Sequence, residues 1–417
     1  MNELIVVTVG LFLISLFFKR RYLTVFNPPT LYSFSFFLSA LAVIVSTKIA
    51  EIAENEHLAN FLDPQDLAYI YAAGVGCFIL PWLRRNPFLK NSIFAEREDV
   101  KDQRQLITIT KVVGVFLLIS LIVAMLMLGR IPFLEMVLNQ INIDDHLTSL
   151  NSLPLGLMAI IAWTHILLTL YLSSLIRFKS VYSVTRVQII SLILILVLSG
   201  LWQGNRQFLL FTIYILIARW YQESTSSLSV RDFIRLFLVA AIFITVFFYI
   251  GSIRLLGQGA SPYDLFGYLT WPAFNLLAII SNSPNVNTDH LPNYLLREIV
   301  PHRLLDFDSL NLMKSNLFEP TSSSGYLSYW YLDYGYLGVC LGSFALGWYS
   351  YKVFKNRNEN EGSMRLNMLV SWVCITSAVY GHFLSLNFFL MPVFLLYLIN
   401  KLFPEIMKTK REPDESY

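Results

Sequence analysis

The chain has 417 residues, of which 55% are hydrophobic, 15% aromatic and only 14% charged, with a formal net charge of +3. Soluble globular proteins carry about 25% charged residues, so this composition excludes an ordinary soluble domain. The mean hydropathy is +0.56. Its apolar blocks are long enough to cross a hydrocarbon core of about 30 Å as helices, which predicts an all-α, polytopic membrane protein.

Eleven apolar blocks are predicted to span the membrane. In chain order they lie near residues 3–18, 31–47, 67–83, 107–128, 153–175, 187–202, 208–221, 232–250, 326–347, 366–382 and 385–403. The basic cluster Lys19, Arg20 and Arg21 follows the first block, whereas a cleavable signal peptide has basic residues before its apolar region. We therefore expect the first block to be a span whose N-terminus lies outside the cytoplasm.

The distribution of basic residues supports this topology. With the N-terminus outside and the C-terminus inside, the inside segments and the adjoining ends of the spans together hold 24 of the 31 lysine and arginine residues. Cytoplasmic segments of membrane proteins are enriched in these residues, so the alternation of the eleven spans is self-consistent. The seven on the outside are Lys48, Arg130, Arg206, Arg254, Arg297, Arg303 and Lys314.

The chain is predicted to form one integral membrane domain over residues 1–417, with a large outside loop over residues 251–325. Unstructured loops of this length are uncommon unless they are functional or disordered. This loop is rich in aromatic and apolar residues, as in "YLTWPAFNLLAII". Such a composition argues against disorder, so we expect short helices in it.

Two arginines are candidates for binding an anion. Arg206 lies in "LWQGNRQFLLF", a short connection between two apolar blocks, and Arg254 follows the eighth predicted span on the same side of the membrane. A guanidinium offers a planar fork of donors that matches phosphate oxygens. Asn205 and Gln207 flank Arg206 and are included as substrate-binding residues. The alternative is that each arginine reaches lipid head groups or pairs with a loop carboxylate.

Further candidates lie later in the chain. Asp333 stands among aromatic residues in "SYWYLDYGYLG", where a carboxylate can orient or deprotonate a hydroxyl group, or can be an interfacial aspartate bonded to water. Trp330 and Tyr331 belong to an aromatic belt whose rings also suit sugar faces. The loop residues Arg297, Arg303 and His290 complete the set of substrate-binding candidates. No pattern in the sequence indicates a metal site, a cofactor or a nucleic-acid partner.

The layout resembles that of the Wzy-type polymerases, which polymerise O-antigen and capsule repeat units in bacterial inner membranes. The similar features are an arginine in a tight outside turn ("GNRQFLL"), a large outside loop late in the chain and the element Y-x-D-[FY]-G-x-x-G. That element is matched by Tyr331, Asp333, Tyr334, Gly335 and Gly338. The similarity of layout covers nearly the whole chain.

The resemblance implies a helical bundle similar to the GT-C glycosyltransferases and an inverting, metal-independent glycosyl transfer on the periplasmic face. It implies that the substrates are oligosaccharides linked to undecaprenyl pyrophosphate, and that a chain-length regulator is a further partner beside membrane lipids. Arg206 and Arg254 would stabilise the charge that develops on the pyrophosphate leaving group. Asp333 would act on the acceptor hydroxyl.

Other functions remain open at the level of sequence. An O-antigen ligase would use the same donor but transfer the glycan to lipid A core, with a histidine such as His290 or His302 in the outer loop. A transporter or flippase of lipid-linked sugars would favour an internal repeat and charges deep in the bundle. A membrane scaffold without chemistry would leave the outside arginines unexplained.

Overall fold

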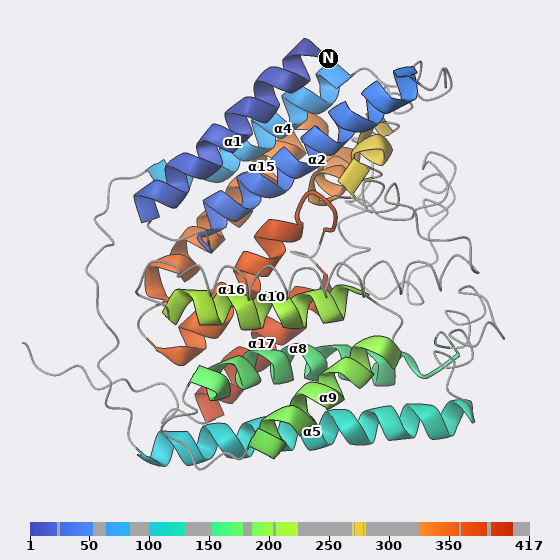
Figure 1. Ribbon diagram of the computed structural model, residues 1–417, viewed down its shortest axis with the longest axis vertical. Helices are drawn as coiled ribbons and strands as arrows, with labels where there is room; N and C mark the ends of the chain where they lie inside the picture. Colours follow the sequence, from blue (N-terminus) through green and yellow to red (C-terminus); the bar gives the residue numbers. More distant parts are fainter. Residues whose placement is uncertain are drawn as a thin grey trace, which may run out of the picture. The chain divides into compact units, whose positions relative to one another are not determined.

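The computed structural model describes residues 1–22, 26–52, 64–83, 100–129, 150, 152–177, 186–202, 206–223, 269–270, 272–277, 279–280, 325–357, 360–381 and 385–402. Within these ranges every regular element is helical (Figure 1). The elements are α1 (Asn2–Tyr22), α2 (Pro28–Ile52), α4 (Pro64–Ile79), the 3₁₀ turn η1 (Leu80–Leu83), α5 (Val100–Leu128), α8 (Leu155–Arg177), α9 (Arg186–Trp202), α10 (Arg206–Glu223), α15 (Tyr326–Asn356), α16 (Glu361–Thr376), the π-helical turn η5 (Leu386–Leu390) and α17 (Met391–Leu402).

Helix length and hydropathy confirm a chain with several potential membrane crossings. Five helical stretches are long and apolar enough to span a membrane, and they lie in α1, α2, α4 with η1, α5 and α8. The helices α9 and α10 and the stretch Leu386–Leu402 contain shorter apolar segments. The chain therefore has the architecture of a multi-pass membrane protein.

Exposed apolar stripes on the long helices are consistent with lipid contact. On α5 the exposed large apolar side chains include a series that recurs every three or four residues: Val112, Val115, Phe116, Ile119, Ile122, Val123 and Leu126. On α1 the same spacing exposes Val6, Val9, Leu13 and Phe17. Apolar patches of this extent are rare on soluble monomers, and hydrocarbon chains can cover them.

The chain divides into two compact units, each assembled from separate stretches of sequence. The first unit contains Met1–Asn91, Leu265–Arg357 and Leu369–Leu390, and the second contains Ser92–Asp264, Asn358–Met368 and Met391–Tyr417. Helix α16 therefore contributes its beginning to the second unit and its end to the first. The division arises from packing and has no counterpart in the composition of the sequence.

In the first unit α1, α2, α4 and α15 pack together (Figure 1). Aromatic residues form its core: the ring of Tyr32 on α2 stacks on Phe78 of α4 with centroids 4.0 Å apart, and its hydroxyl lies 3.2 Å from Ser343 Oγ of α15. At η1, the Trp82 indole donates a hydrogen bond of 3.0 Å to the carbonyl of Gly347. A side chain at position 347 would meet the backbone of Phe78, so this glycine allows α15 to approach α4 closely.

The second unit consists of α5, α8, α9, α10, the start of α16 and α17. Its apolar core contains Leu117, Leu121, Ile161, Leu168, Leu172, Leu192, Leu196 and Trp202, from α5, α8 and α9. The short connection between α9 and α10 makes these helices neighbours, and a side chain at Gly200 would meet Leu209 across it. Buried polar residues lie where α8 faces α10 and the start of α16.

Every predicted span except one coincides with a described helix, and the exception, 232–250, lies outside the described residues. The predicted span 366–382 ends early, because α16 stops at Thr376 and a turn follows. The predicted span 326–347 differs most. The helix begins where expected, but it is broken at Gly335 and continues to Asn356, nine residues beyond the predicted end.

Candidate functional site

The break in α15 falls inside the Tyr-x-Asp-Tyr-Gly element. Gly335 has φ 59° and ψ −145°, a backbone conformation that residues with a side chain rarely adopt. The Tyr326 hydroxyl donates a hydrogen bond of 2.7 Å to the carbonyl of Gly342. Residues 16 apart in a straight helix are separated by about 24 Å, so this bond forms because the segment before Gly335 folds back on the segment after it.

Two glycines that follow the break, Gly338 and Gly342, make room for this fold. A side chain at Gly338 would meet the backbone carbonyl of Trp330, and one at Gly342 would meet the Trp330 indole ring. Two small residues four apart, such as Gly338 and Gly342, commonly mark a contact between two helices. Instead, the pair receives a residue of its own broken helix, because the reversal at Gly335 brings Trp330 back onto it.

The segment before the break brings together three predicted site residues, Trp330, Tyr331 and Asp333. Asp333 and Tyr331 are buried, with 8% and 7% of their surface exposed. The Tyr331 ring packs edge-on against Tyr336 with centroids 5.6 Å apart. Both tyrosines interact electrostatically with Asp66, on the first turn of α4. Asp66 therefore lies near the phenols that surround the segment before the break.

This group of residues is chemically suited to hydroxylated ligands. Carboxylates accept hydrogen bonds from hydroxyl groups, and aromatic rings pack against the apolar faces of sugars. Tyr334 and Tyr336 remain 43% exposed, so phenol groups next to the buried Asp333 can be reached from outside the unit. Sequence reasoning missed Asp66, although its position at the beginning of an apolar block was visible.

The connection predicted to hold Arg206 is shorter than expected, and Arg206 is the first residue of the helix that follows it. Helix α9 ends at Trp202 and α10 begins at Arg206, so three residues connect them. The structure describes the backbone of Arg206 but not its side chain. Gln207 is half-buried and makes polar contacts. The remaining predicted site residues lie outside the described residues: Asn205, Arg254, His290, Arg297 and Arg303.

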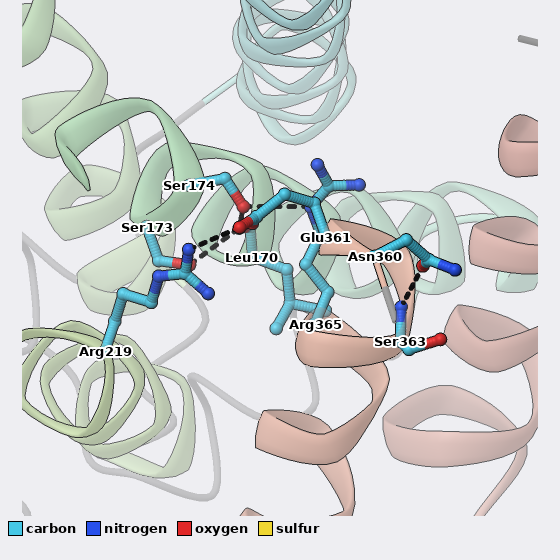
Figure 2. Close-up of polar contacts among 8 residues, drawn as sticks. All are labelled: Leu170, Ser173, Ser174, Arg219, Asn360, Glu361, Ser363 and Arg365. Atoms are coloured by element: carbon cyan, nitrogen blue, oxygen red, sulfur yellow. Dashed lines mark hydrogen bonds and ion pairs between the residues drawn. The ribbon is translucent and has the colours of Figure 1, made fainter. Parts of the chain in front are cut away.

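A buried ion pair joins α10 to α16 in the second unit (Figure 2). Arg219 Nη2 lies 2.6 Å from Glu361 Oε1, and each side chain is only 4% exposed. Removing two charges from water is costly, and a buried pair recovers that cost only with good geometry and further hydrogen bonds. The pair was not predicted, although an arginine near the end of an apolar block is a signal for it.

Arg365 lies one turn further along α16 and is entirely buried. Its Nε donates a hydrogen bond of 3.0 Å to Ser174 Oγ, and its guanidinium lies 4.3 Å from the centre of the Tyr171 ring. Its two terminal nitrogens have no hydrogen-bond acceptor among the described residues, and Figure 2 shows them pointing away from the Glu361 carboxylate. Arg365 therefore lies one helical turn from Glu361 without pairing with it.

A second buried polar group joins α8 to the first turns of α10. His165 Nε2 lies 3.2 Å from the carbonyl oxygen of Phe208 and 3.0 Å from Thr212 Oγ1. Thr169 Oγ1 lies 3.1 Å from Thr212 Oγ1 and donates a hydrogen bond of 3.0 Å to the His165 carbonyl. Sequence reasoning passed over His165, although an ionisable residue in the middle of an apolar block is a recognised signal of function.

Comparison with protein-family models, curated proteins and solved structures finds no match for this chain. Within the described ranges, no group of three or more histidine, cysteine, aspartate or glutamate side chains is placed to hold a metal ion. The function is therefore inferred from the chemistry of the site residues.

Proposed function

We propose that this protein is a glycosyltransferase of bacterial inner membranes that polymerises oligosaccharide repeat units linked to undecaprenyl pyrophosphate. The observation that supports it most is the buried Asp333 beside the glycine break of α15. The element that resembles the Wzy-type polymerases is the one in which the helix reverses. Its carboxylate and aromatic rings have the chemistry that a glycan acceptor requires.

In the proposed reaction an acceptor hydroxyl oxygen attacks the anomeric carbon of the donor sugar. The new glycosidic C–O bond forms as the bond from the anomeric carbon to the pyrophosphate oxygen breaks, with inversion at that carbon. Asp333 accepts the hydroxyl proton, and undecaprenyl pyrophosphate leaves as the anion. Arg206 and Arg254 stabilise the charge on that anion, because fixed guanidinium donors are most effective where charge develops.

The remaining predicted residues have binding roles in this proposal. Asn205 and Gln207 extend the anion site around Arg206, while Trp330 and Tyr331 contact sugar rings. Arg297, Arg303 and His290, in the predicted outer loop, hold the lipid-linked oligosaccharides. The proposed orientation places the N-terminus in the periplasm and the C-terminus in the cytoplasm.

Purified protein incubated with a single lipid-linked repeat unit tests this function. A ladder of products is expected for a polymerase. A single transfer that requires lipid A core would identify a ligase instead, and movement of the substrate across liposomes without any new bond would identify a transporter. The ladder should persist in the presence of a chelator, whereas a strict requirement for Mg²⁺ would contradict the role given to the arginines.

A further inference from the structure

The hydrogen bonds around His165 determine which of its ring nitrogens carries hydrogen. The Phe208 carbonyl can only accept a hydrogen bond, so the Nε2 atom 3.2 Å from it is the protonated nitrogen. Nδ1 has no hydrogen-bond partner among the described residues. An imidazolium would leave a second, buried N–H without an acceptor, so the neutral ring with hydrogen on Nε2 fits this environment.

The threonine hydroxyls extend this network in one direction. The Thr169 hydroxyl donates to the His165 carbonyl, and each hydroxyl has a single hydrogen. Thr169 Oγ1 therefore accepts from Thr212, and the single hydrogen on His165 Nε2 is shared in a three-centre bond between Thr212 Oγ1 and the Phe208 carbonyl. These hydrogen bonds link α8 to α10. Within them, His165 is the residue that contacts Phe208 on the first turn of α10.

We propose that His165 is a positioning residue for Arg206. This inference rests on the proposed function. Arg206 is the first residue of α10, and Phe208, whose carbonyl and ring both contact His165, is two residues further on. The ring centroids lie 5.0 Å apart in an edge-on arrangement. His165 thus fixes the turn of α10 that carries the guanidinium, without contacting the substrate.

Two substitutions separate this role from simple packing. The amide nitrogen of a glutamine extends about as far as histidine Nε2, so His165→Gln retains a donor for the Phe208 carbonyl. The amide nitrogen of an asparagine extends only about as far as Nδ1, so His165→Asn removes that donor while leaving a polar side chain. Thr164→Val is the matched control, because among the described residues the Thr164 hydroxyl bonds carbonyls of its own helix alone, those of Ile160 and Ile161.

The measurement is the kinetics of chain extension by full-length protein with a defined lipid-linked repeat unit. We expect His165→Asn to lower kcat by about 10- to 100-fold, the size of effect that a misplaced site produces. His165→Gln should restore most of the rate, and Thr164→Val should leave it unchanged. In an Arg206→Lys background, His165→Asn should lower kcat by a smaller factor, because the guanidinium that His165 positions is absent.

Three outcomes would overturn the inference. Normal kcat in His165→Asn would show that the contact does not matter. An equal fold-loss in the wild-type and Arg206→Lys backgrounds, with a matching fall in thermal stability, would assign His165 a structural role only. A wild-type protein that forms no ladder would overturn the proposed function, and this inference with it, whereas a wild-type ladder with a normal His165→Asn variant overturns the inference alone.

Discussion

At the scale of single residues, Arg206 provides the most direct test of the proposed chemistry. Arg206→Ala should abolish chain extension while the protein still inserts and folds, because the leaving pyrophosphate loses its guanidinium. Arg206→Lys should restore only part of the rate, since an ammonium group lacks the bidentate fork. Product ladders from purified variants of matched thermal stability would measure this, and near-normal polymer from Arg206→Ala would contradict the assignment.

Gly335 is the residue whose conformation shapes the acceptor side of the proposal. Gly335→Ala should destabilise the protein by about 1–3 kcal/mol, because a side chain is strained at its positive φ. Gly76→Ala is the control within the same unit: it lies in α4, and nothing approaches within 4 Å of an added Cβ. Thermal unfolding in detergent compares the two, and an equally stable Gly335→Ala variant would argue against the break.

At the scale of helices, the charges around Glu361 predict an asymmetry between two substitutions. Glu361→Gln removes the carboxylate that pairs with the buried Arg219 and should cost about 3–5 kcal/mol. Arg219→Met should cost less, about 1–3 kcal/mol, because Arg365 is four residues after Glu361 on α16 and can pair with it. Denaturation of single variants measures both changes in the free energy of unfolding.

The control for this asymmetry is Arg365→Met. In that background Arg365 can no longer pair with Glu361, so Arg219→Met should become about as destabilising as Glu361→Gln. If Arg219→Met and Glu361→Gln lower the free energy of unfolding equally in the wild-type protein, Arg365 does not pair with Glu361 when Arg219 is absent. In the Arg365→Met background, the double variant Arg219→Met/Glu361→Met should cost little more than Arg365→Met alone, since it removes both charges of the pair together and leaves no Arg365 charge behind.

At the scale of the whole molecule, packing within the first unit can be compared with the predicted topology. The ring of Tyr22, at the end of α1, contacts Phe354, near the end of α15, with centroids 5.4 Å apart. The basic ends of these two helices, with Lys19 and Lys355, therefore lie at the same end of the unit. The predicted alternation of spans also runs both helices in the same direction. The packing of Tyr22 on Phe354 does not depend on the count of basic residues.

Cysteine labelling tests the orientation directly. In a variant lacking the three native cysteines, Lys19→Cys and Lys355→Cys should react with an impermeant maleimide only from the cytoplasmic side. Gln65→Cys lies on the first turn of α4, which the predicted topology places outside, so it should react only from the periplasmic side. Labelling of Lys19→Cys and Lys355→Cys from different sides would contradict the packing, and labelling of all three from the reverse sides would invert the topology.

The sequence by itself determined the class of the protein and the position of most helices. Apolar blocks must become helices in a bilayer, because each backbone amide needs a partner and lipid offers none. Length and hydropathy therefore predicted spans such as 3–18 and 107–128 without any knowledge of packing. The turn before Arg206 was found for the same reason, as a short polar gap between two apolar blocks.

The contacts between residues far apart in the sequence follow from the tertiary structure alone. The reversal of α15 depends on the φ of one glycine, which hydropathy does not record, so the predicted span 326–347 missed it. The Arg219–Glu361 pair joins residues 142 apart in the chain, and the contacts of His165 span 43 and 47 residues. A composition profile treats each charge according to its own neighbours in sequence, whereas a buried charge is stabilised by neighbours in space.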